Sequence, residues 1–357
     1  MALLSPAGAG PSSAPRATPS AASRCGVRVV ALGGGTGLPI VLRGLKSAIF
    51  PPGPVTPGAR DQSRLTAIVT AADDGGSSGR LREAFRMQPP GDIRNCLLAL
   101  ADGDPTLSAI FGFRFDGGAS RGVGGHSLGN LILAALNHLE SDFLRALERA
   151  TQLLAVRGRV LPATLDDVRL VAEFTDETRV EGESRIARER RPIRRVYLRP
   201  ASARALPEAR RAIAAADVIL LGPGSLYTSV IPVLLVRGLA DAIAAARGRV
   251  VLALNLMSEP GETDGYGAAD FVGAIRRHAP QVAIDDVLMN VAPIPAARSS
   301  SYAAAEARPV RADRAGVAAH GCRIVERDLL GAGPLIRHAP DKLARAILEI
   351  AREVPAR

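Results

Sequence analysis

The most constraining feature of the sequence is a glycine-rich turn within Val27–Leu45 (VRVVALGGGTGLPIVLRGL). An apolar run leads into the glycines, and apolar positions with helical spacing follow them. A strand, a tight glycine turn and a helix form the phosphate-binding unit of many α/β proteins. Glycine adopts positive φ freely, and the helix N-terminus offers unpaired N–H groups to an anion. The turn therefore predicts an anion site made of Gly33, Gly34, Gly35, Thr36 and Gly37.

Strand-like and helix-like segments alternate along much of the chain after this unit. The expected strands span residues 65–70, 218–221, 250–255 and 287–290. The expected helices span residues 80–86, 93–101, 126–154, 207–215, 225–235, 240–246, 268–277 and 341–352. Repeated units of this kind imply a mostly parallel sheet covered by helices on both faces. The predicted fold is Rossmann-like, a three-layer α/β/α arrangement.

The chain of 357 residues is predicted to form one nucleotide-binding domain over residues 25–357. Residues 1–24 are rich in Ala, Ser, Pro and Gly and are expected to be a disordered tail without the apolar centre of a secretory signal. Whether this tail belongs to the natural protein stays open. Residues 51–60 are expected to form a surface loop. Residues 157–200 contain three strand-like segments and are predicted to be a β-rich insertion, with an arginine cluster at 185–195 of undefined role.

Composition narrows the class of protein. The net charge is +10, but aromatic residues do not interleave with the basic clusters, so nucleic-acid binding is not expected. No apolar run reaches the roughly 18–20 residues of a membrane span. The three cysteines are far apart in the sequence and form no disulfide framework. These observations favour a cytoplasmic protein, and a homo-oligomer is left open.

A second candidate site follows the expected strand at 65–70, in the segment DDGGSSG. Ligands of doubly wound sheets lie beyond the carboxyl ends of the strands. Asp73 and Asp74 can there bind ribose hydroxyls or hold Mg²⁺ through oxygen ligands. Ser77 and Ser78 can bind phosphate. An N-cap followed by a polar loop is the alternative without a ligand.

Two further helix starts carry polar groups. Asp92 is expected to cap the helix at 93–101, and Arg94 and Asn95 follow it; Arg94 can pair with a phosphate or with the acidic turn. His126 and Asn130 lie at the start of the helix expected at 126–154. His126 can act as a general acid or base near pH 7, although a histidine in a cap often has a structural role.

A third glycine turn, GPGS, follows the expected strand at 218–221. Gly222, Gly224 and Ser225 suit a second phosphate of the ligand. Asn255, at the end of the next expected strand, is placed to recognise a base or a sugar. Several such turns, each after a strand or opening a helix, predict a phosphate-rich, nucleotide-like ligand.

Several common enzyme classes lack their motifs in this chain. The dinucleotide fingerprint fails because Leu38 stands where its third glycine belongs. The chain also lacks a P-loop, a G-x-S-x-G nucleophile elbow, an H-E-x-x-H motif and a cysteine cluster for zinc. Catalytic residues are therefore not assigned.

The motifs together resemble a known family. LGGGTGLPIVLRGLK, TAIVTAADDGGSSGRLR, PPGDIRN, GHSLGN, VRGRVLPAT, LGPGSLYTSVIP and NLMSEPGETDGY occur in this order. The chain is similar over residues 27–352 to YvcK-type gluconeogenesis factors, which belong to the wider family of 2-phospho-L-lactate transferase, CofD. The resemblance implies nucleotide contacts at the first glycine turn, the acidic turn, Asn255 and the GPGS turn. It also implies sugar-nucleotide contacts at Tyr302, which can stack on a base or sugar, and at Arg337, which can pair with a diphosphate.

The resemblance implies two alternative functions. The first is a cytosolic UDP-sugar-binding regulator, with UDP-N-acetylglucosamine as ligand, required for cell shape and for growth on gluconeogenic carbon sources. Such a regulator would act through protein partners in cell-wall synthesis and would need no cofactor for binding. The alternative is a phospholactyl-type transferase that uses a guanosine nucleotide donor, a deazaflavin acceptor and Mg²⁺ held by Asp73 and Asp74.

Overall fold

A computed structural model of the chain describes residues 26–50, 62–117, 122–304 and 306–353. The predicted tail (1–24) and the predicted loop at 51–60 lie outside the described residues. The strands are β1 (Val29–Gly33), β2 (Leu65–Val69), β3 (Arg159–Pro162), β4 (Arg169–Phe174), β5 (Arg179–Glu181), β6 (Ile193–Arg199), β7 (Val218–Leu221), β8 (Arg249–Ala253), β9 (Asp286–Asn290) and β10 (Arg323–Arg327). The helices are α1 (Gly37–Ile49), α3 (Gly76–Phe85), α4 (Pro90–Leu100), α5 (Pro105–Gly112), α6 (Leu128–Glu140), α7 (Phe143–Leu153), α8 (Glu183–Glu189), α9 (Pro207–Ala214), the π-helix η2 (Leu226–Val230), α10 (Ile231–Leu234), α11 (Leu239–Ala245), α12 (Ala268–His278), α13 (Ala296–Ala304), α14 (Arg314–Ala319) and α15 (Pro340–Glu353).

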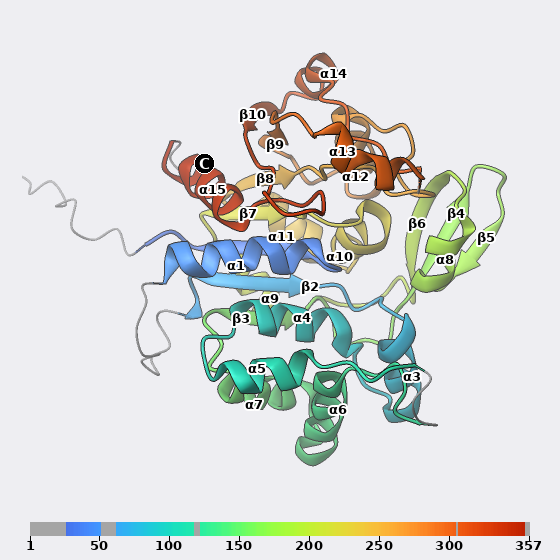
Figure 1. Cartoon of the computed structure of the whole chain (residues 1–357), viewed down its shortest axis with the longest axis vertical. Coiled ribbons are helices and arrows are strands. Elements are labelled where there is room, and N and C mark those ends of the chain that lie inside the picture. Colours follow the sequence, from blue (N-terminus) through green and yellow to red (C-terminus); the bar gives the residue numbers. More distant parts are fainter. Residues whose placement is uncertain (1–25, 51–61, 118–121, 305, 354–357) are drawn as a thin grey trace, which may run out of the picture.

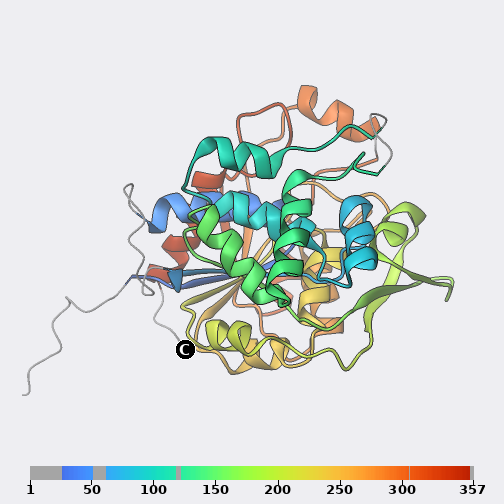
Figure 2. The same ribbon diagram turned by 90° about the horizontal axis from the view of Figure 1, so that it is seen from below.

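The main sheet holds seven parallel strands in the order β10-β9-β8-β7-β1-β2-β3. Helices cover both faces of this sheet (Figures 1 and 2). α1, α4 and α15 pack together on one face, and α9, α10, α11 and α12 lie on the other. The predicted Rossmann-like three-layer α/β/α fold is confirmed.

Strand β1 shows how the sequence builds this arrangement. Val29 and Ala31 belong to the apolar core on the α1 face, whereas Val30 and Leu32 belong to the core on the opposite face. Successive side chains of a strand point to opposite faces, so a strand covered on both sides must be apolar at every position. This is why β1 appears in the sequence as a continuous apolar run.

The strand order reverses between β1 and β7. From β1 the chain continues to β2 and β3 on one side, and from β7 it continues to β8, β9 and β10 on the other. The helices that follow β1 and β7 lie on opposite faces of the sheet, α1 on one and η2 with α10 on the other, which leaves a crevice at the carboxyl ends of two neighbouring strands. In Figure 1 the arrowhead of β2 points to this end of the molecule, where α3 and the small sheet lie.

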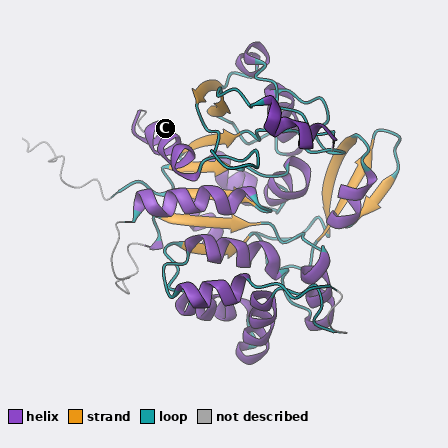
Figure 3. Ribbon diagram, in the orientation of Figure 1, coloured by secondary structure: helices purple, strands orange, loops and turns teal. Residues whose placement is uncertain are grey.

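A second, small sheet is antiparallel and has the order β5-β4-β6, with α8 between β5 and β6 in the chain (Figure 3). The structure differs from the predicted insertion of 157–200 at its first strand. β3 pairs in parallel with β2 and completes the main sheet, so the chain leaves that sheet only after Pro162. An apolar four-residue strand carries no local signal that tells these two sheets apart.

The prediction of a single helix over residues 126–154 is wrong. This segment forms two helices, α6 and α7, and Ser141 between them has a φ of 53°. Asp142 caps the second helix, because its side chain accepts a hydrogen bond from the Arg145 N–H.

Among the described residues, no helix combines the length and the apolar character needed to cross a bilayer.

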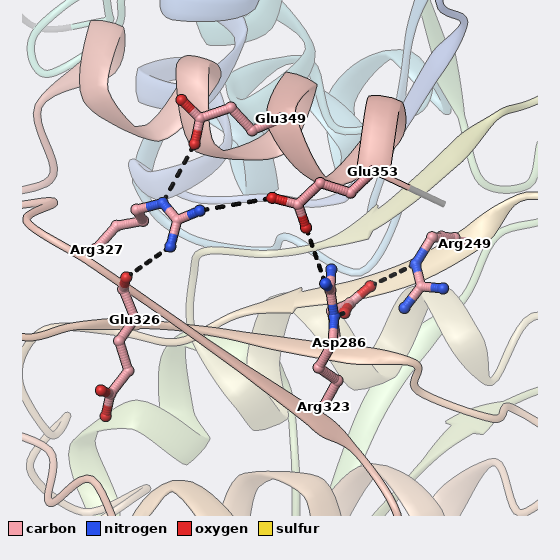
Figure 4. Close-up of polar contacts among 7 residues, drawn as sticks. All are labelled: Arg249, Asp286, Arg323, Glu326, Arg327, Glu349 and Glu353. Atoms are coloured by element: carbon pink, nitrogen blue, oxygen red, sulfur yellow. Dashed lines mark hydrogen bonds and ion pairs between the residues drawn. The ribbon is translucent and has the colours of Figure 1, made fainter. Parts of the chain in front are cut away.

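An ion-pair network fastens the last helix to the edge of the sheet (Figure 4). Asp286 is fully buried, and its two oxygens accept hydrogen bonds from Arg249 Nε at 2.7 Å and from Arg323 Nε at 2.5 Å. Arg323 also pairs with Glu353 at 2.8 Å, which joins β8, β9 and β10 to α15. Removing this buried carboxylate is costly, because Arg249 loses its ion pair and Arg323 keeps only Glu353.

We predict that Asp286→Ala lowers the free energy of unfolding by about 3–5 kcal/mol, the range found when one partner of a buried ion pair is removed. Glu349→Ala is the matched control, since Glu349 pairs with Arg327 at the half-exposed end of the network and should cost at most about 1 kcal/mol. Urea denaturation of both variants measures the difference. Equal losses would contradict the role given to Asp286.

Candidate functional site

A cavity of about 600 Å³ opens at the switch point between β1 and β7. Its walls come from the turns after β1 and β7, the segment after β8, α8 of the small sheet, α13 and the segment before α15. The predicted site residues that line it are Gly35, Thr36, Gly37, Gly224, Ser225, Asn255, Tyr302 and Arg337. The structure thus brings predicted residues from five separate parts of the chain into one cavity.

The glycine turns after β1 and β7 pack directly against each other. A Cβ at Gly37 would overlap the Pro223 carbonyl oxygen, and a Cβ at Gly224 would lie 3.2 Å from the Gly34 carbonyl oxygen. The two backbones therefore leave no room for a side chain at Gly37. Gly33, Gly35, Gly222 and Gly224 have φ values of 153°, 62°, 72° and 156°, in the region that glycine adopts freely.

Asn255 ties the segment after β8 to the turn after β7. Its Oδ1 accepts a hydrogen bond from the Gly224 N–H at 3.1 Å, and its Nδ2 donates to the Gly224 carbonyl at 3.0 Å. Nδ2 also donates to Glu259 Oε1 at 3.2 Å. Because these contacts occupy both ends of the amide, Asn255 shapes the cavity wall as well as lining it.

Glu262 supports the start of η2 from behind. Its carboxylate accepts hydrogen bonds from Ser225 Oγ at 2.5 Å, Thr228 Oγ1 at 3.1 Å and the Tyr227 N–H at 3.3 Å. Burial raises the pKa of Glu262 above its ordinary value, while these donors lower it. Burial also raises the pKa of Glu259, to about 8.

One end of the cavity is apolar and aromatic. Leu256, Met257, Ala307 and Ile336 form a small buried cluster, and Tyr302 packs against it. The Tyr302 hydroxyl accepts a hydrogen bond from the Ile336 N–H at 3.0 Å, so its own hydrogen is left to donate. The exposed Arg337 lines the same end.

His338 also lines the cavity and is almost fully buried. Burial lowers its pKa to about 4, so the ring is neutral at pH 7. The ring bonds to the Leu254 backbone, and its Nε2 has no hydrogen-bond partner among the described residues. A buried acceptor without a partner gains stability from a ligand that offers it a donor.

A group of carboxylates adjoins the cavity. Asp92 Oδ2 accepts a hydrogen bond from the Gly35 N–H at 2.8 Å, inside the first glycine turn. Asp73 Oδ1 accepts one from the Gly75 N–H at 2.9 Å. Glu183 at the start of α8 lines the cavity, and a Cβ at Gly75 would lie 3.4 Å from Asp73 Oδ1 and 3.9 Å from Glu183 Oε2. The two carboxyl groups therefore both approach the Cβ position of Gly75.

Asp74 bonds to the backbone at the start of α8. Its Oδ1 accepts a hydrogen bond from the Ser184 N–H at 2.8 Å, and a Cβ at Gly182 would lie 2.5 Å from its Oδ2. This contact holds the start of α8, and with it Glu183, against the acidic turn. Asp73 and Asp74 are neighbours in sequence but meet different partners.

Burial and mutual repulsion raise the pKa values of these carboxyl groups. The pKa of Asp92 rises to about 6, through burial first and then the charge of Asp73. The pKa of Glu183 rises to about 8, through burial and then the charges of Asp73, Asp92 and Asp74. Burial also raises the pKa of Asp73. Such crowding of acidic groups in a cavity favours protons or a cation there.

Two contacts predicted from the sequence are corrected. Asp92 is not the N-cap of its helix, because α4 already begins at Pro90, a residue well suited to the first helical turn. Arg94 donates to Asn130 Oδ1 at 3.0 Å and to Asn95 Oδ1 at 2.7 Å, and no hydrogen bond to Asp73 or Asp74 is among its contacts in the described part of the chain. It is a buried arginine that orients other polar side chains.

Arg94 begins a directed chain of hydrogen bonds that ends at a histidine. Because Asn130 Oδ1 accepts from Arg94, its Nδ2 is free to donate to Ser77 Oγ, at 3.0 Å. Ser77 Oγ in turn lies 2.9 Å from His126 Nδ1, to which it can donate. This order places the imidazole hydrogen on Nε2. Burial lowers the pKa of His126, as do Arg80 and Arg114 nearby.

The predicted residues thus fall into two groups. The cavity group consists of the two glycine turns with Asn255, Tyr302 and Arg337, and the carboxylates Asp73 and Asp92 adjoin it. Ser77, Ser78, Asn95, His126 and Asn130 surround α3, α4 and α6, outside the cavity lining. Ser78 supports α4, since its Oγ accepts from the Gly91 N–H at 3.1 Å.

Four acceptors of the cavity were absent from the predicted site: Glu183, Glu259, Glu262 and His338. Glu259 and Glu262 belong to the polar segment after β8, which was a usable signal because polar residues after a parallel strand face the ligand edge. Glu183 and His338 carried no such signal. They reach the cavity only through the small sheet and the segment before α15.

Known proteins resemble this chain over most of its length. The family model described as 2-phospho-L-lactate transferase CofD matches residues 29–330. The chain belongs to the CofD family. Within it, the chain is 44% identical over 322 residues to the gluconeogenesis factor of Halalkalibacterium halodurans, covering 90% of this chain and 95% of that protein. It is 42% identical over 327 residues to the gluconeogenesis factor of Bacillus subtilis, covering 91% and 98%.

A relative from Nostoc sp., a putative gluconeogenesis factor, is 46% identical over 327 residues, which cover 91% of this chain and 68% of that one. Among solved structures, a crystal structure of a UPF0052-family protein from Bacillus halodurans matches with a TM-score of 0.83 at 42% identity, covering 90% of this chain and all of that one. The resemblance to YvcK-type gluconeogenesis factors is therefore confirmed.

We predict that Glu183→Gln raises the melting temperature more at pH 9 than at pH 5. The folded-state pKa of Glu183, about 8, lies above its unfolded value, so the folded protein binds the extra proton and loses stability as pH rises through this interval. A glutamine at this position does not ionise, so the variant does not lose this stability as the pH rises. Glu181→Gln, on the neighbouring strand β5, is the control. A shift for Glu183→Gln that is the same at both pH values would contradict the environment described for Glu183.

Proposed function

We propose that this chain binds a nucleotide sugar, UDP-N-acetylglucosamine, in the cavity at the switch point, and that it acts as a cytoplasmic regulatory protein without turnover. The observation that carries the proposal is the division of one cavity into a backbone-lined end and an apolar, aromatic end. A volume of about 600 Å³ lies within the usual range for small-molecule sites. The two ends match the two chemistries of a nucleotide, its phosphates and its base.

The backbone-lined end suits a diphosphate. α1 spans 13 residues and opens into the cavity at Gly35, Thr36 and Gly37. Its first turn contains no acidic side chain, and no side chain caps it. The Gly35 N–H before the helix is bound to Asp92, but the N–H groups of the first helical turn and the positive end of the helix dipole are available to an anion. Gly224 and Ser225 face the same space from the other turn.

The apolar end suits a planar base that carries both hydrogen-bond donors and acceptors. Tyr302 offers an aromatic wall and a hydroxyl donor, and Leu256, Met257 and Ile336 complete the apolar surface. His338 offers an acceptor without a partner among the described residues. Uracil presents an N–H group between two carbonyls, so it can satisfy both kinds of group. Arg337 at the rim can pair with a phosphate.

The biological part of the proposal rests on the relatives. The proteins from Halalkalibacterium halodurans and Bacillus subtilis are named gluconeogenesis factors. We extend that role to this chain and include in it cell shape and a link to cell-wall precursor metabolism through protein partners.

The first test is calorimetric titration of the full chain with UDP-N-acetylglucosamine. Tyr302→Ala should weaken binding by about 5-fold to 150-fold, since stacking of a base on an aromatic ring is worth about 1–3 kcal/mol. Arg337→Ala should have an effect of similar size. Arg308→Ala is the matched control, because Arg308 is exposed nearby but does not line the cavity. No heat of binding at millimolar ligand would remove the proposal.

The second candidate is a transferase that uses Mg²⁺, and the matched family model and the carboxylates beside the first glycine turn favour it. The described residues contain no group of three or more side chains arranged to hold a metal by themselves. Mg²⁺ usually takes one or two carboxylates and completes its shell with phosphates and waters. Asp73 and Asp92 fit that use, with Asp74 largely committed to α8. When bound, the metal would neutralise charge on the phosphates.

The transferase reading predicts a product. Incubation with the activated guanosine donor, a deazaflavin acceptor and Mg²⁺ should release GMP, and Asp73→Asn should abolish the release without loss of the fold. Liquid chromatography of the nucleotides measures this. Absence of GMP, together with tight binding of UDP-N-acetylglucosamine, would leave the regulator as the function.

A further inference from the structure

A second cavity, of about 440 Å³, lies between the small sheet and α12, away from the site just described. Arg179 and Arg195 reach it from the small sheet, and Arg277 and His278 reach it from the end of α12. Tyr197 forms an aromatic wall, and Val196 lies at its base. We call this cavity the arginine groove.

The groove has a surplus of positive charge. Glu173 is almost fully buried, and its single carboxylate accepts from Arg179 Nε at 3.0 Å and from Arg195 Nη2 at 2.9 Å. Arg194 approaches the same carboxylate at 3.5 Å. Arg194 also lies 3.8 Å from Glu177, so two carboxylates balance these three guanidinium groups. Arg277 adds a fourth, and it has no ion pair among the described residues.

Other arginines of this region have carboxylates outside the groove: Arg199 pairs with Glu181 at 2.7 Å, and Arg191 pairs with Asp176 at 2.8 Å. The arginines that line the groove lie close together around one cavity. This grouping favours a compact anion with its charges close together over a long acidic peptide, which would need cations along a strip of surface.

His278 holds the two walls of the groove together. Its Nε2 accepts a hydrogen bond from the Val196 N–H at 3.0 Å, and its Nδ1 donates to the Ala274 carbonyl at 2.7 Å. Both ring nitrogens are thus occupied within the protein. The histidine fixes β6 against α12, and the arginines are left to meet a ligand.

We propose that the arginine groove binds a small organic polyanion, of the class of phosphorylated metabolites, through Arg179, Arg195 and Arg277. A guanidinium group can bind phosphate oxygens through two N–H groups at once. Arg179 and Arg195 hold Glu173 through Nε and Nη2, which leaves the Nη1 of each exposed side chain to meet such a ligand. The volume suits a molecule of this size.

The position of the groove gives the ligand a regulatory effect, and this part rests on the proposed function. The small sheet carries α8 and Glu183 into the nucleotide cavity, and α12 follows the segment that carries Glu259 and Glu262. An anion that bridges Arg195 and Arg277 ties together two walls of that cavity. Binding at one site then changes affinity at the other by the same factor in both directions.

The test uses 1,3-propanediol bisphosphate as the probe, titrated by calorimetry into the full chain without nucleotide. The double variant Arg179→Gln/Arg277→Gln should weaken binding at least tenfold. Arg199→Gln/Arg211→Gln removes the same charge from surface ion pairs outside the groove and should bind as the unmodified chain does. Equal affinities of the two double variants would overturn the site, and so would tighter binding of octaglutamate that is lost in the groove variant.

Two further readouts separate this proposal from the proposed function. Because the probe is titrated without nucleotide, failure of UDP-N-acetylglucosamine to bind leaves the groove result standing. Where both bind, saturating probe should change the dissociation constant of UDP-N-acetylglucosamine at least threefold in the unmodified chain and not in Arg179→Gln/Arg277→Gln. An unchanged constant in the unmodified chain overturns the coupling, and simple competition that persists in the groove variant places the probe in the nucleotide cavity.

Discussion

The close packing of two glycine turns across neighbouring parallel strands is the constraint on which the rest of the site depends. β1 and β7 lie side by side, but their chains continue in opposite directions across the sheet. The turns that follow them touch through backbone alone, with Gly37 against Pro223 and Gly224 against Gly34. This contact opens the N-terminus of α1 toward the cavity and places the start of η2 beside it.

Three carboxyl groups lie close together on the acidic side of the site, and no arginine forms an ion pair with them among the described residues. Asp73, Asp92 and Glu183 are drawn together by the acidic turn, by α4 and by α8, with burial and repulsion raising their pKa values. Arg94 is nearby but donates its hydrogen bonds to amides. A bound cation, or protons on the carboxyl groups, would relieve this repulsion. The segment of the small sheet that carries α8 adds to this repulsion, because Asp74 holds the start of α8, and with it Glu183, beside the other carboxyl groups.

Much of the fold could be predicted from the sequence because its signals are local. Buried parallel strands are continuous apolar runs, and glycine turns mark their carboxyl ends, as at Gly33 and Gly222. The position of Asn255 after a buried strand likewise predicted its place at this edge of the sheet. Prediction failed where a local pattern is compatible with two structures. Ser141 interrupts a helical pattern without a glycine or proline to signal the break, and the strand at 159–162 joins the main sheet although the segments after it do not.

The site was predictable only in its local parts. The glycine turns lie in the cavity because a turn after a parallel strand must lie at that edge of the sheet. Glu183 and His338 reach it through packing between segments far apart in sequence. The contacts of Asp92 and Arg94 also required the structure, because spacing alone does not tell an N-cap from a residue that bonds another turn.

The most direct test of the account is a crystal structure of the full chain with UDP-N-acetylglucosamine bound. We expect the diphosphate between the N-terminus of α1 and the turn at Gly224, with the uracil beside Tyr302 and His338. A diphosphate bound elsewhere, or a ligand that leaves both glycine turns untouched, would contradict it.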